Sequence, residues 1–380
     1  MLAYLLLFSG FLVLSAKLVL LEVALCTYII GHVKYTEIDW STYMQQVQCF
    51  ADGIWNYSKI EGDTGPVVYP AGHLYSYGIL YLLTNKGLNI LRAQYIFEGL
   101  YLLTVILVPP FVLLFITCIS YRIHSIFLLR LFNDPIAMLL FYIALNFWVS
   151  QKWTCGAVFY SLAVSVKMNV LLYAPAVFFI FLLSNRIKGT IKLLTLCGII
   201  QVLLALPFLI TDPFAYVARS FDLGRVFLFK WTVNWRFLPE TVFLSRTFHI
   251  CLLILHIFLL LTFALSCWFR RQGGLLLLLH ILYVVFTSNL LGIAVARSLH
   301  YQFYSWYFHS LPYLLFSTLN FEKFDNKSES SVILIAIEIC WNTYPSTIAS
   351  SLCLQLLHIV MIMMMFIYGI SHGIKKSKKA

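Results

Sequence analysis

Residues 35–72 read YTEIDWSTYMQQVQCFADGIWNYSKIEGDTGPVVYPAG, and strongly apolar sequence lies on both sides of this polar stretch. The stretch holds five carboxylates and one lysine, namely Glu37, Asp39, Asp52, Glu61, Asp63 and Lys59. A carboxylate just beyond an apolar span can lie near the bilayer surface and still reach water, so acid–base chemistry is expected here first. The alternative is a solvated loop whose acids only keep the segment out of the lipid.

The composition places most of the chain in lipid. Of its 380 residues, 61% are hydrophobic, 17% are aromatic and only 11% are charged, with a mean hydropathy of +0.88. A soluble domain carries roughly 25% charged residues. We therefore expect an all-α multispan membrane protein with roughly ten to twelve spans of about 20 residues each. The spans are expected to form a single integral membrane domain over residues 1–380.

Charge and cysteine usage argue against two other classes of protein. The net charge of +11 comes from cations spread over short loops and the tail, which is typical of positive-inside bias and not of nucleic-acid binding. The nine cysteines include no CxxC pair, and most lie in apolar runs. We expect neither a disulfide framework nor a metal site, and no cofactor.

Breaks in the apolar pattern predict where helices start and stop. A retained first span over about 14–33 is favoured over a cleaved signal peptide, because no small-residue cleavage site follows the apolar run. Residues 73–92 are rich in tyrosine and suit a helix at the membrane interface. The prolines at 109–110 predict a tight turn, and Asp134, followed by proline, predicts a helix start. The remaining apolar stretches are about 93–108, 111–127, 135–150, 154–166, 170–184, 193–210, 247–269, 275–292, 305–320, 332–341 and 348–370.

The positions of lysine and arginine predict the orientation. Basic links at 186–192 and 270–271 and the basic tail, about 371–380, are expected to face the cytosol. Alternation of spans then puts two large loops, about 34–92 and 211–246, in the opposite compartment. The second loop carries five cations against three anions, and this excess suggests a bound anion, although a salt-bridged loop gives the same composition.

Two short motifs bear on the compartment. The chain ends in Lys-Ser-Lys-Lys-Ala, which matches the cytosolic dilysine retrieval pattern of endoplasmic reticulum membrane proteins. Asn56 is a glycosylation acceptor that falls on the lumenal side in this topology. Both motifs favour an endoplasmic reticulum membrane protein whose large loops face the lumen.

An acidic loop, a cationic loop and a lipid-soluble body together fit glycosyl transfer from a lipid-phosphate sugar. The phosphate leaves without needing a proton, so one carboxylate acting as general base on the acceptor hydroxyl suffices. Cations must then hold the phosphate and offset its growing charge. A soluble nucleotide-sugar donor is disfavoured, because the sequence has no Walker-type glycine loop and no DxD triplet.

Long motifs extend this interpretation through resemblance. From about residue 17 onward the chain resembles the family of endoplasmic reticulum dolichyl-phosphate-mannose-dependent alpha-1,3-mannosyltransferases, which extend the pentamannosyl lipid-linked oligosaccharide. The resemblance implies the multispan GT-C glycosyltransferase fold and an inverting transfer in N-glycan precursor assembly. It also implies two partners, the dolichyl phosphate mannose donor and the dolichyl-diphosphate-linked acceptor. The motifs that carry it are YTEIDWSTYM, GDTGPVVYPAGHLY, SYRIHSIFLLRLFNDPIAM, SLAVSVKMNVLLYAP, RSFDLGRVFLFKWTVNWRFLPE, FTSNLLGI, RSLHYQFYSWYFHSLPYLL and WNTYPST.

The GT-C resemblance implies a catalytic base early in the first lumenal loop. The matching positions are Glu37 and Asp39, and Asp39 is preferred because the ring of Trp40 beside it could limit water and raise the pKa of the carboxyl. Asp63, between two glycines, is the second choice, and a purely structural turn is the alternative there. Arg297 and His300 are expected to bind the donor phosphate. Further substrate-binding candidates are Tyr69, Asp134, Lys167, Arg219, Arg225, Trp235 and Arg236.

Two other functions stay open at this stage. A sister dolichyl-phosphate-sugar transferase with another acceptor would share the fold and the chemistry. A multispan lipid or sugar transporter would share the composition, but such proteins often show inverted repeats and broken helices near the midplane, which the sequence does not display. Release of dolichyl phosphate from a mannosyl donor would distinguish the transferases from the transporter.

Overall fold

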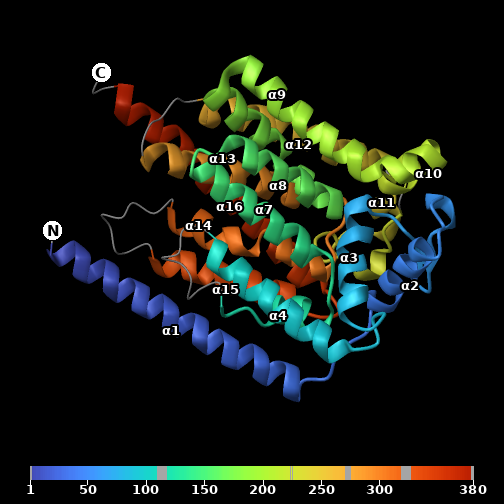
Figure 1. The fold of residues 1–380 in the computed structure, drawn as a ribbon. Coiled ribbons are helices and arrows are strands. Elements are labelled where there is room, and N and C mark those ends of the chain that lie inside the picture. The colour runs from blue at the N-terminus through green and yellow to red at the C-terminus, as the bar shows by residue number, and fades with distance from the viewer. Residues whose placement is uncertain are drawn as a thin grey trace. The chain divides into compact units, whose positions relative to one another are not determined.

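A computed structural model describes residues 2–108, 118–222, 224, 226–269, 275–317 and 327–377, and most of these residues are helical (Figure 1). The strands within this range form one short antiparallel hairpin, β1 (Glu61–Gly62) and β2 (Gly65–Pro66). The chain divides into two compact units, each described by itself. The prolines at 109–110, Arg225, the basic link at 270–271 and the last three residues lie outside the described residues.

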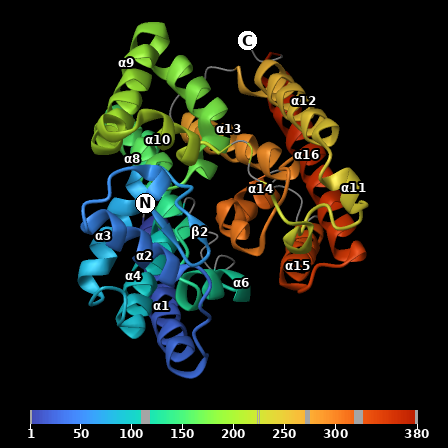
Figure 2. The ribbon, with the colours of Figure 1, turned by 90° about the vertical axis from the view of Figure 1, so that its right-hand side faces the viewer.

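The first unit comprises Met1–Phe147, Thr154–Met168 and Leu196–Leu223. In Figure 2 its helices α1, α2, α3 and α4, coloured blue to cyan, lie together, and α1 packs on α4 and α2 on α3. Its elements are α1 (Leu2–His32), α2 (Trp40–Ala51), η1 (Tyr57–Lys59), α3 (Ala71–Leu83), α4 (Ile90–Leu107), α6 (Tyr121–His124), the π-helix η3 (Ser125–Leu129), α7 (Asp134–Val149), α8 (Trp153–Val166), the second half of α9 (Ala174–Thr211) and α10 (Pro213–Ser220).

The second unit comprises Trp148–Trp153, Asn169–Thr195 and Gly224–Ala380. Within it α12 packs on α13, α13 on α16, and α14 on α15. Its elements are η4 (Met168–Tyr173), the first half of α9, η5 (Phe229–Trp231), α11 (Glu240–Phe243), α12 (Arg246–Phe263), the π-helix η6 (Ala264–Trp268), α13 (Leu275–Ala294), η7 (Tyr301–Trp306), η8 (Phe308–Ser310), α14 (Leu311–Ser317), α15 (Lys327–Asn342) and α16 (Ile348–Ser377).

Several helices are long and apolar enough to cross a membrane, as the composition predicts. In the described part of the chain there are five by length and composition, and a sixth if the helices on either side of a 109° bend count as one broken span. The five segments are Ser15–His32, Ile90–Leu107, Met168–Thr211, Arg246–Trp268 and Ile348–Ser371. Two shorter apolar helices in this part of the chain are Trp153–Val166 and Leu279–Ala294.

The long segment Met168–Thr211 contains a break that the sequence predicts. Arg186 has φ 57° and ψ 178°, which no α-helix accommodates. The break falls in the basic link between the apolar stretches expected at 170–184 and 193–210. The two halves of this segment therefore correspond to the two predicted stretches.

One predicted apolar stretch, over 305–320, is described only as far as residue 317. From 305 to 317 the chain forms the short helices η7, η8 and α14 and no single continuous helix. Pro312 lacks a backbone N–H, and its place as the second residue of α14, which begins at Leu311, is one that proline favours.

A close approach of two backbones fixes the start of α3. A Cβ on Gly72 would collide with the hydroxyl of Ser165 on α8, so only glycine fits there. This contact brings the first turn of α3 against the end of α8, beside Lys167. It positions the polar groups described next.

Candidate active site

The two candidate bases lie at the start of α2 and have different surroundings. The Glu37 carboxylate is exposed and accepts hydrogen bonds from the Tyr35 hydroxyl at 2.7 Å and the Ser41 backbone N–H at 3.0 Å. Asp39 occupies the N-cap position without a side-chain bond to the helix backbone. Its Oδ2 instead accepts from the hydroxyl of Tyr43, one turn later, at 3.3 Å. Glu37 thus holds the helix start, while Asp39 faces the side chains along α2.

Trp40 packs into the core of the first unit. Its indole is 2% exposed, donates to the Gly87 carbonyl at 3.0 Å, and lies against the rings of Tyr77 and Phe97. The shielding of Asp39 by this ring, expected from the sequence, stays a prediction.

The hydroxyl of Tyr43 connects Asp39 to a buried aromatic cluster. Tyr43 lies 3.3 Å from the hydroxyl of Tyr69, and the rings of Tyr43 and Tyr69 both pack on the imidazole of His73, with centroids 4.7 and 4.6 Å away. Burial, and then the nearby Tyr69 and Asp39, keep the pKa of Tyr43 well above its usual range. Tyr43 therefore remains a hydroxyl that donates to the Asp39 carboxylate.

Lys167 and Asp134 form a buried ion pair on the other side of His73. Lys167 Nζ lies 2.7 Å from Asp134 Oδ2 and 2.8 Å from Asn133 Oδ1, and the Asp134 side chain is fully buried. Lys167 Nζ also lies 5.4 Å from the centre of the Tyr69 ring. Asp134 is the first residue of α7, where the helix dipole favours a negative charge.

These contacts determine which ring nitrogen of His73 carries the proton. Since Lys167 donates to Asn133 Oδ1, the amide must turn its Nδ2 toward His73, whose Nδ1 it meets at 3.3 Å. Nδ1 therefore accepts, and the proton of the neutral ring lies on Nε2. Burial, and then the charge of Lys167, lower the pKa of His73 to about 3, so the ring is neutral near pH 7. No hydrogen-bond acceptor for Nε2 occurs among the described residues.

The first unit thus gathers four of the predicted residues into one network. Asp39, Tyr69, Asp134 and Lys167 are connected through side chains that the sequence analysis did not single out, namely Tyr43, His73 and Asn133. His73 and Asn133 both lie in motifs quoted above, GDTGPVVYPAGHLY and the segment ending NDPIAM. A polar residue beside the start of an apolar helix was the signal that could have found them.

Asp63 lies outside this network. It is exposed at the turn of the β1–β2 hairpin, where its Oδ2 accepts from Gln45 Nε2 and its backbone N–H donates to Gln45 Oε1, both at 2.7 Å. The paired bonds to one glutamine favour the structural alternative for this residue. Arg219, half-buried on α10, belongs to the same unit.

The first loop and the start of the second are joined within this unit. Asn56 Nδ2 donates to Asp212 Oδ2 at 3.2 Å, and the other oxygen of Asp212 caps α10 by accepting from Ala215 N–H. Asn56 Oδ1 also accepts from the backbone and hydroxyl of Ser58. The predicted loops 34–92 and 211–246 therefore contact each other here.

The second unit gathers the other predicted cations around aromatic rings. The Arg297 guanidinium lies 5.3 Å from the centre of the Phe227 ring, and the His300 imidazole meets the same ring edge-on at 5.4 Å. His300 also stacks on Phe303 at 5.1 Å. Phe227 thus brings Arg297 and His300 to one place.

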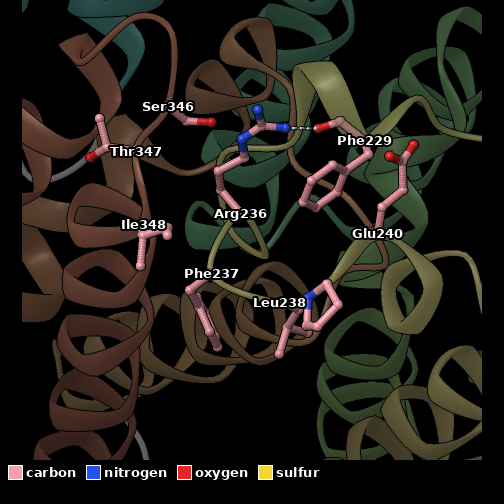
Figure 3. Close-up of a pocket in the computed structure, with 9 residues that line it drawn as sticks. Phe229, Arg236, Phe237, Leu238, Glu240, Ser346, Thr347 and Ile348 are labelled. Carbon is pink, nitrogen blue, oxygen red and sulfur yellow. Dashed lines mark hydrogen bonds between the residues drawn. The ribbon is translucent and has the colours of Figure 1, made fainter.

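Trp235 ties the second loop to the end of α13. Its indole N–H donates to the Ala296 carbonyl at 2.7 Å, and the neighbouring Asn234 amide donates to the same oxygen at 2.9 Å. Asn234 Oδ1 in turn accepts from the Leu299 N–H. These bonds fix the loop segment that presents the adjacent Arg236 to a pocket (Figure 3).

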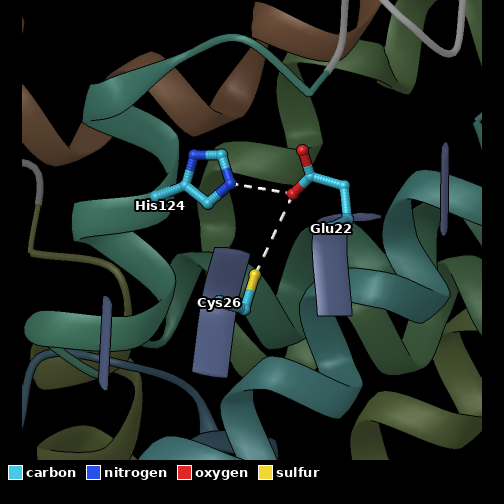
Figure 4. Close-up of side chains that lie close together, drawn as sticks. All are labelled: Glu22, Cys26 and His124. Atoms are coloured by element: carbon cyan, nitrogen blue, oxygen red, sulfur yellow. Dashed lines mark hydrogen bonds and ion pairs between the residues drawn. The ribbon is translucent and has the colours of Figure 1, made fainter. Parts of the chain in front are cut away.

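A further group of ionisable side chains lies buried between α1 and α6 (Figure 4). His124 Nε2 lies 2.9 Å from Glu22 Oε2, and the Cys26 thiol lies 3.9 Å from the same oxygen. The three donor atoms lie within 4.8 Å of one another, so this group has the donor types of a metal site. His124 Nε2 and Glu22 Oε2 lie within hydrogen-bonding distance, and this contact offsets the cost of burying the polar side chain of Glu22 on α1.

Comparison with known proteins identifies the family. The family described as ALG3 protein matches residues 16–351. The chain belongs to this family. The mouse and human Dol-P-Man:Man(5)GlcNAc(2)-PP-Dol alpha-1,3-mannosyltransferases are each 47% identical to it over 94% of this chain and 87% of their own length. The Arabidopsis thaliana protein of the same name is 43% identical over 91% of this chain and 85% of its own length. The family expected from the motifs is confirmed.

Proposed function

We propose that this protein transfers mannose from dolichyl phosphate mannose to the pentamannosyl dolichyl-diphosphate oligosaccharide, forming an alpha-1,3 linkage. The observation that carries this proposal is the family match over residues 16–351, together with relatives of that named activity at 47% identity. The multispan helical fold supports it, because both substrates carry a polyprenol chain that remains in the bilayer.

Asp39 is the proposed general base. It removes the proton from the acceptor hydroxyl as that oxygen attacks the anomeric carbon of the donor mannose, and the dolichyl phosphate leaves with the bonding electrons. Attack on the face opposite the leaving group turns a beta-linked donor into an alpha-linked product, so the proposed mechanism is inverting. The Tyr43 hydroxyl, which donates to Asp39 at 3.3 Å, keeps the carboxylate oriented. Glu37, already committed to the helix start, is the second candidate.

The leaving phosphate needs positive or hydrogen-bonding groups, because its negative charge grows in the transition state. Arg297 and His300 are the proposed contacts to the donor phosphate, since Phe227 holds them together. The other proposed substrate-binding residues are Asp63, Tyr69, Asp134, Lys167, Arg219, Arg225, Trp235 and Arg236. No step in this scheme calls for a metal ion.

The proposed location is the endoplasmic reticulum membrane, with the active site facing the lumen. The lysine and arginine distribution and the family match support it. In this topology the loops 34–92 and 211–246 are lumenal, the tail 371–380 is cytosolic, and residues 1–380 act as one integral membrane domain.

An in vitro transfer assay tests the proposal. Purified protein is incubated with short-chain dolichyl phosphate mannose and the pentamannosyl lipid-linked acceptor, with and without chelator. We expect one added alpha-1,3-mannose, release of dolichyl phosphate, no effect of the chelator, and loss of turnover in Asp39→Asn. Product formation that survives Asp39→Asn moves the base to another carboxylate. Absence of product from folded protein favours the transporter or a transferase with another acceptor.

A further inference from the structure

The second unit contains a pocket built from two distant segments. It has a volume of about 540 Å³ and is lined by Phe229, by 236–240 and by 346–348 (Figure 3). The first two parts belong to the second loop, and the third follows α15. The volume lies within the range of roughly 300–1,000 Å³ that is usual for small-molecule sites.

Hydrogen bonds between the segments hold the pocket open in one shape. The Ser346 hydroxyl donates to the Thr232 carbonyl at 2.6 Å, and the backbone N–H of Arg236 donates to the Ser351 hydroxyl at 2.9 Å. Both bonds join the second loop to the segment around the start of α16. A ligand would therefore meet walls that are already in place, which lowers the entropic cost of binding.

Two opposite charges line this pocket without pairing. The Arg236 guanidinium lies 4.5 Å from the centre of the Phe229 ring and donates one N–H to the Phe229 carbonyl at 3.2 Å. Of the ion pairs found in the described part of the chain, none includes Arg236 or Glu240. A guanidinium has five N–H donors, so Arg236 retains donors for a ligand, and Glu240 retains acceptors.

The charge balance and lining decide the class of ligand. One cation and one anion give the pocket no net charge, whereas a diphosphate would need an excess of positive groups. The remaining lining side chains are apolar, apart from two hydroxyls, and they are Phe229, Phe237, Leu238, Pro239, Ile348, Ser346 and Thr347. Apolar faces beside a separated donor and acceptor suit a pyranose ring, which presents C–H groups on its faces and hydroxyls at its rim.

We propose that this pocket binds a neutral hexose of the acceptor oligosaccharide, with Arg236 donating to its hydroxyls and Glu240 accepting from them. The proposal rests on the proposed function and narrows it, because the sequence placed Arg236 only among the general substrate-binding candidates. It makes the pocket part of the recognition of the glycan, separate from the lipid diphosphate.

The test separates glycan from diphosphate recognition in the full-length protein. Transfer is measured in the presence of two inhibitors, the neutral pentamannosyl oligosaccharide without its lipid diphosphate, and inorganic pyrophosphate. Arg236→Gln and Glu240→Gln are each expected to raise the acceptor KM and the inhibition constant of the neutral oligosaccharide about tenfold or more, the usual effect of losing a hydrogen bond to a charged group. The donor KM and the inhibition by pyrophosphate stay unchanged.

Arg246→Gln is the matched control, because Arg246 is exposed in the same loop region and does not line the pocket. Glu240 is also exposed, so Glu240→Gln should fold normally even if Arg236→Gln does not. If Arg236→Gln changed only the inhibition by pyrophosphate, the pocket would be an anion site and the proposal would be overturned. The proposal would also be overturned if the oligosaccharide inhibited both variants as strongly as it inhibits the wild-type protein. If the wild-type protein transfers no mannose but calorimetry shows that it binds the oligosaccharide through Arg236 and Glu240, the proposed function fails and the pocket assignment stands.

Discussion

Removing the Lys167 cation should lower the stability of the fold, because the buried carboxylate of Asp134 loses its partner. In Lys167→Met the Asp134 side chain, which is 0% exposed, loses a cation at 2.7 Å. Removing one partner of such a buried pair costs about 3–5 kcal/mol of unfolding free energy. Loss of the bond to Asn133 adds to this, typically by about 1 kcal/mol. Denaturant unfolding in detergent, followed by tryptophan fluorescence, measures the change.

The double variant Lys167→Met/Asp134→Leu tests the reasoning. Replacing both charges with apolar side chains removes the uncompensated charge, so we expect it to recover most of the lost stability and the double-mutant cycle to give a coupling of about 3 kcal/mol. A loss below about 1 kcal/mol in Lys167→Met would refute the pair as a buried contact. If the double variant is stable but does not transfer mannose, Lys167 or Asp134 contacts substrate; if it recovers activity, the pair supports the fold alone.

Three further predictions concern the same unit. In the unfolded state His73 is protonated below pH 6.5, whereas in the folded state it stays neutral until about pH 3. The stability that the neutral ring contributes is therefore complete above pH 6.5 and falls on acidification, by about 2 kcal/mol at pH 5. The free energy of unfolding, measured over a pH series, should vary less with pH in His73→Gln, and an unchanged slope would contradict the assignment. Asp39→Asn should lower kcat by a factor of about 10²–10⁴ and leave the free energy of unfolding unchanged. Glu37→Gln should chiefly destabilise the start of α2. Steady-state kinetics and unfolding curves together distinguish these two results. Gly72→Ala should lower the free energy of unfolding by about 1–3 kcal/mol through its clash with Ser165. Gly78 lies on the same helix with open space around it, so Gly78→Ala should raise the free energy of unfolding by up to about 1 kcal/mol. Equal shifts in the thermal unfolding temperature of the two variants would argue against the close approach.

Apolar runs and their breaks were enough to predict most helices. The basic link that contains Arg186 marks the break in α9, and the sequence around Asp134 marks the start of α7. These features are local, because each depends on residues within one or two turns. The short helices within 305–317 could not be predicted from hydropathy, because hydropathy carries no information on the breaks between them.

The candidate site was harder to predict because its contacts join distant segments. Lys167 was expected from the sequence to bind substrate, yet it is bonded to a carboxylate that lies 33 residues earlier in the chain. His73 reads as an ordinary polar residue on an apolar helix until Asn133, 60 residues later, fixes its tautomer. Periodicity and composition carry no information on such pairs, so residue types in the motifs predicted the chemistry and the fold supplied the connections.

The buried contact between Glu22 and His124 has a consequence for how the chain enters the membrane during synthesis. The two residues are 102 positions apart. Because translation adds about 5–20 residues per second, His124 is synthesised roughly 5–20 s after Glu22. A charged side chain at the centre of a span costs about 2.5–3.5 kcal/mol on insertion scales. The contact that buries Glu22 therefore forms only after α6 has been translated, so the packing of α1 within the membrane is completed late in synthesis.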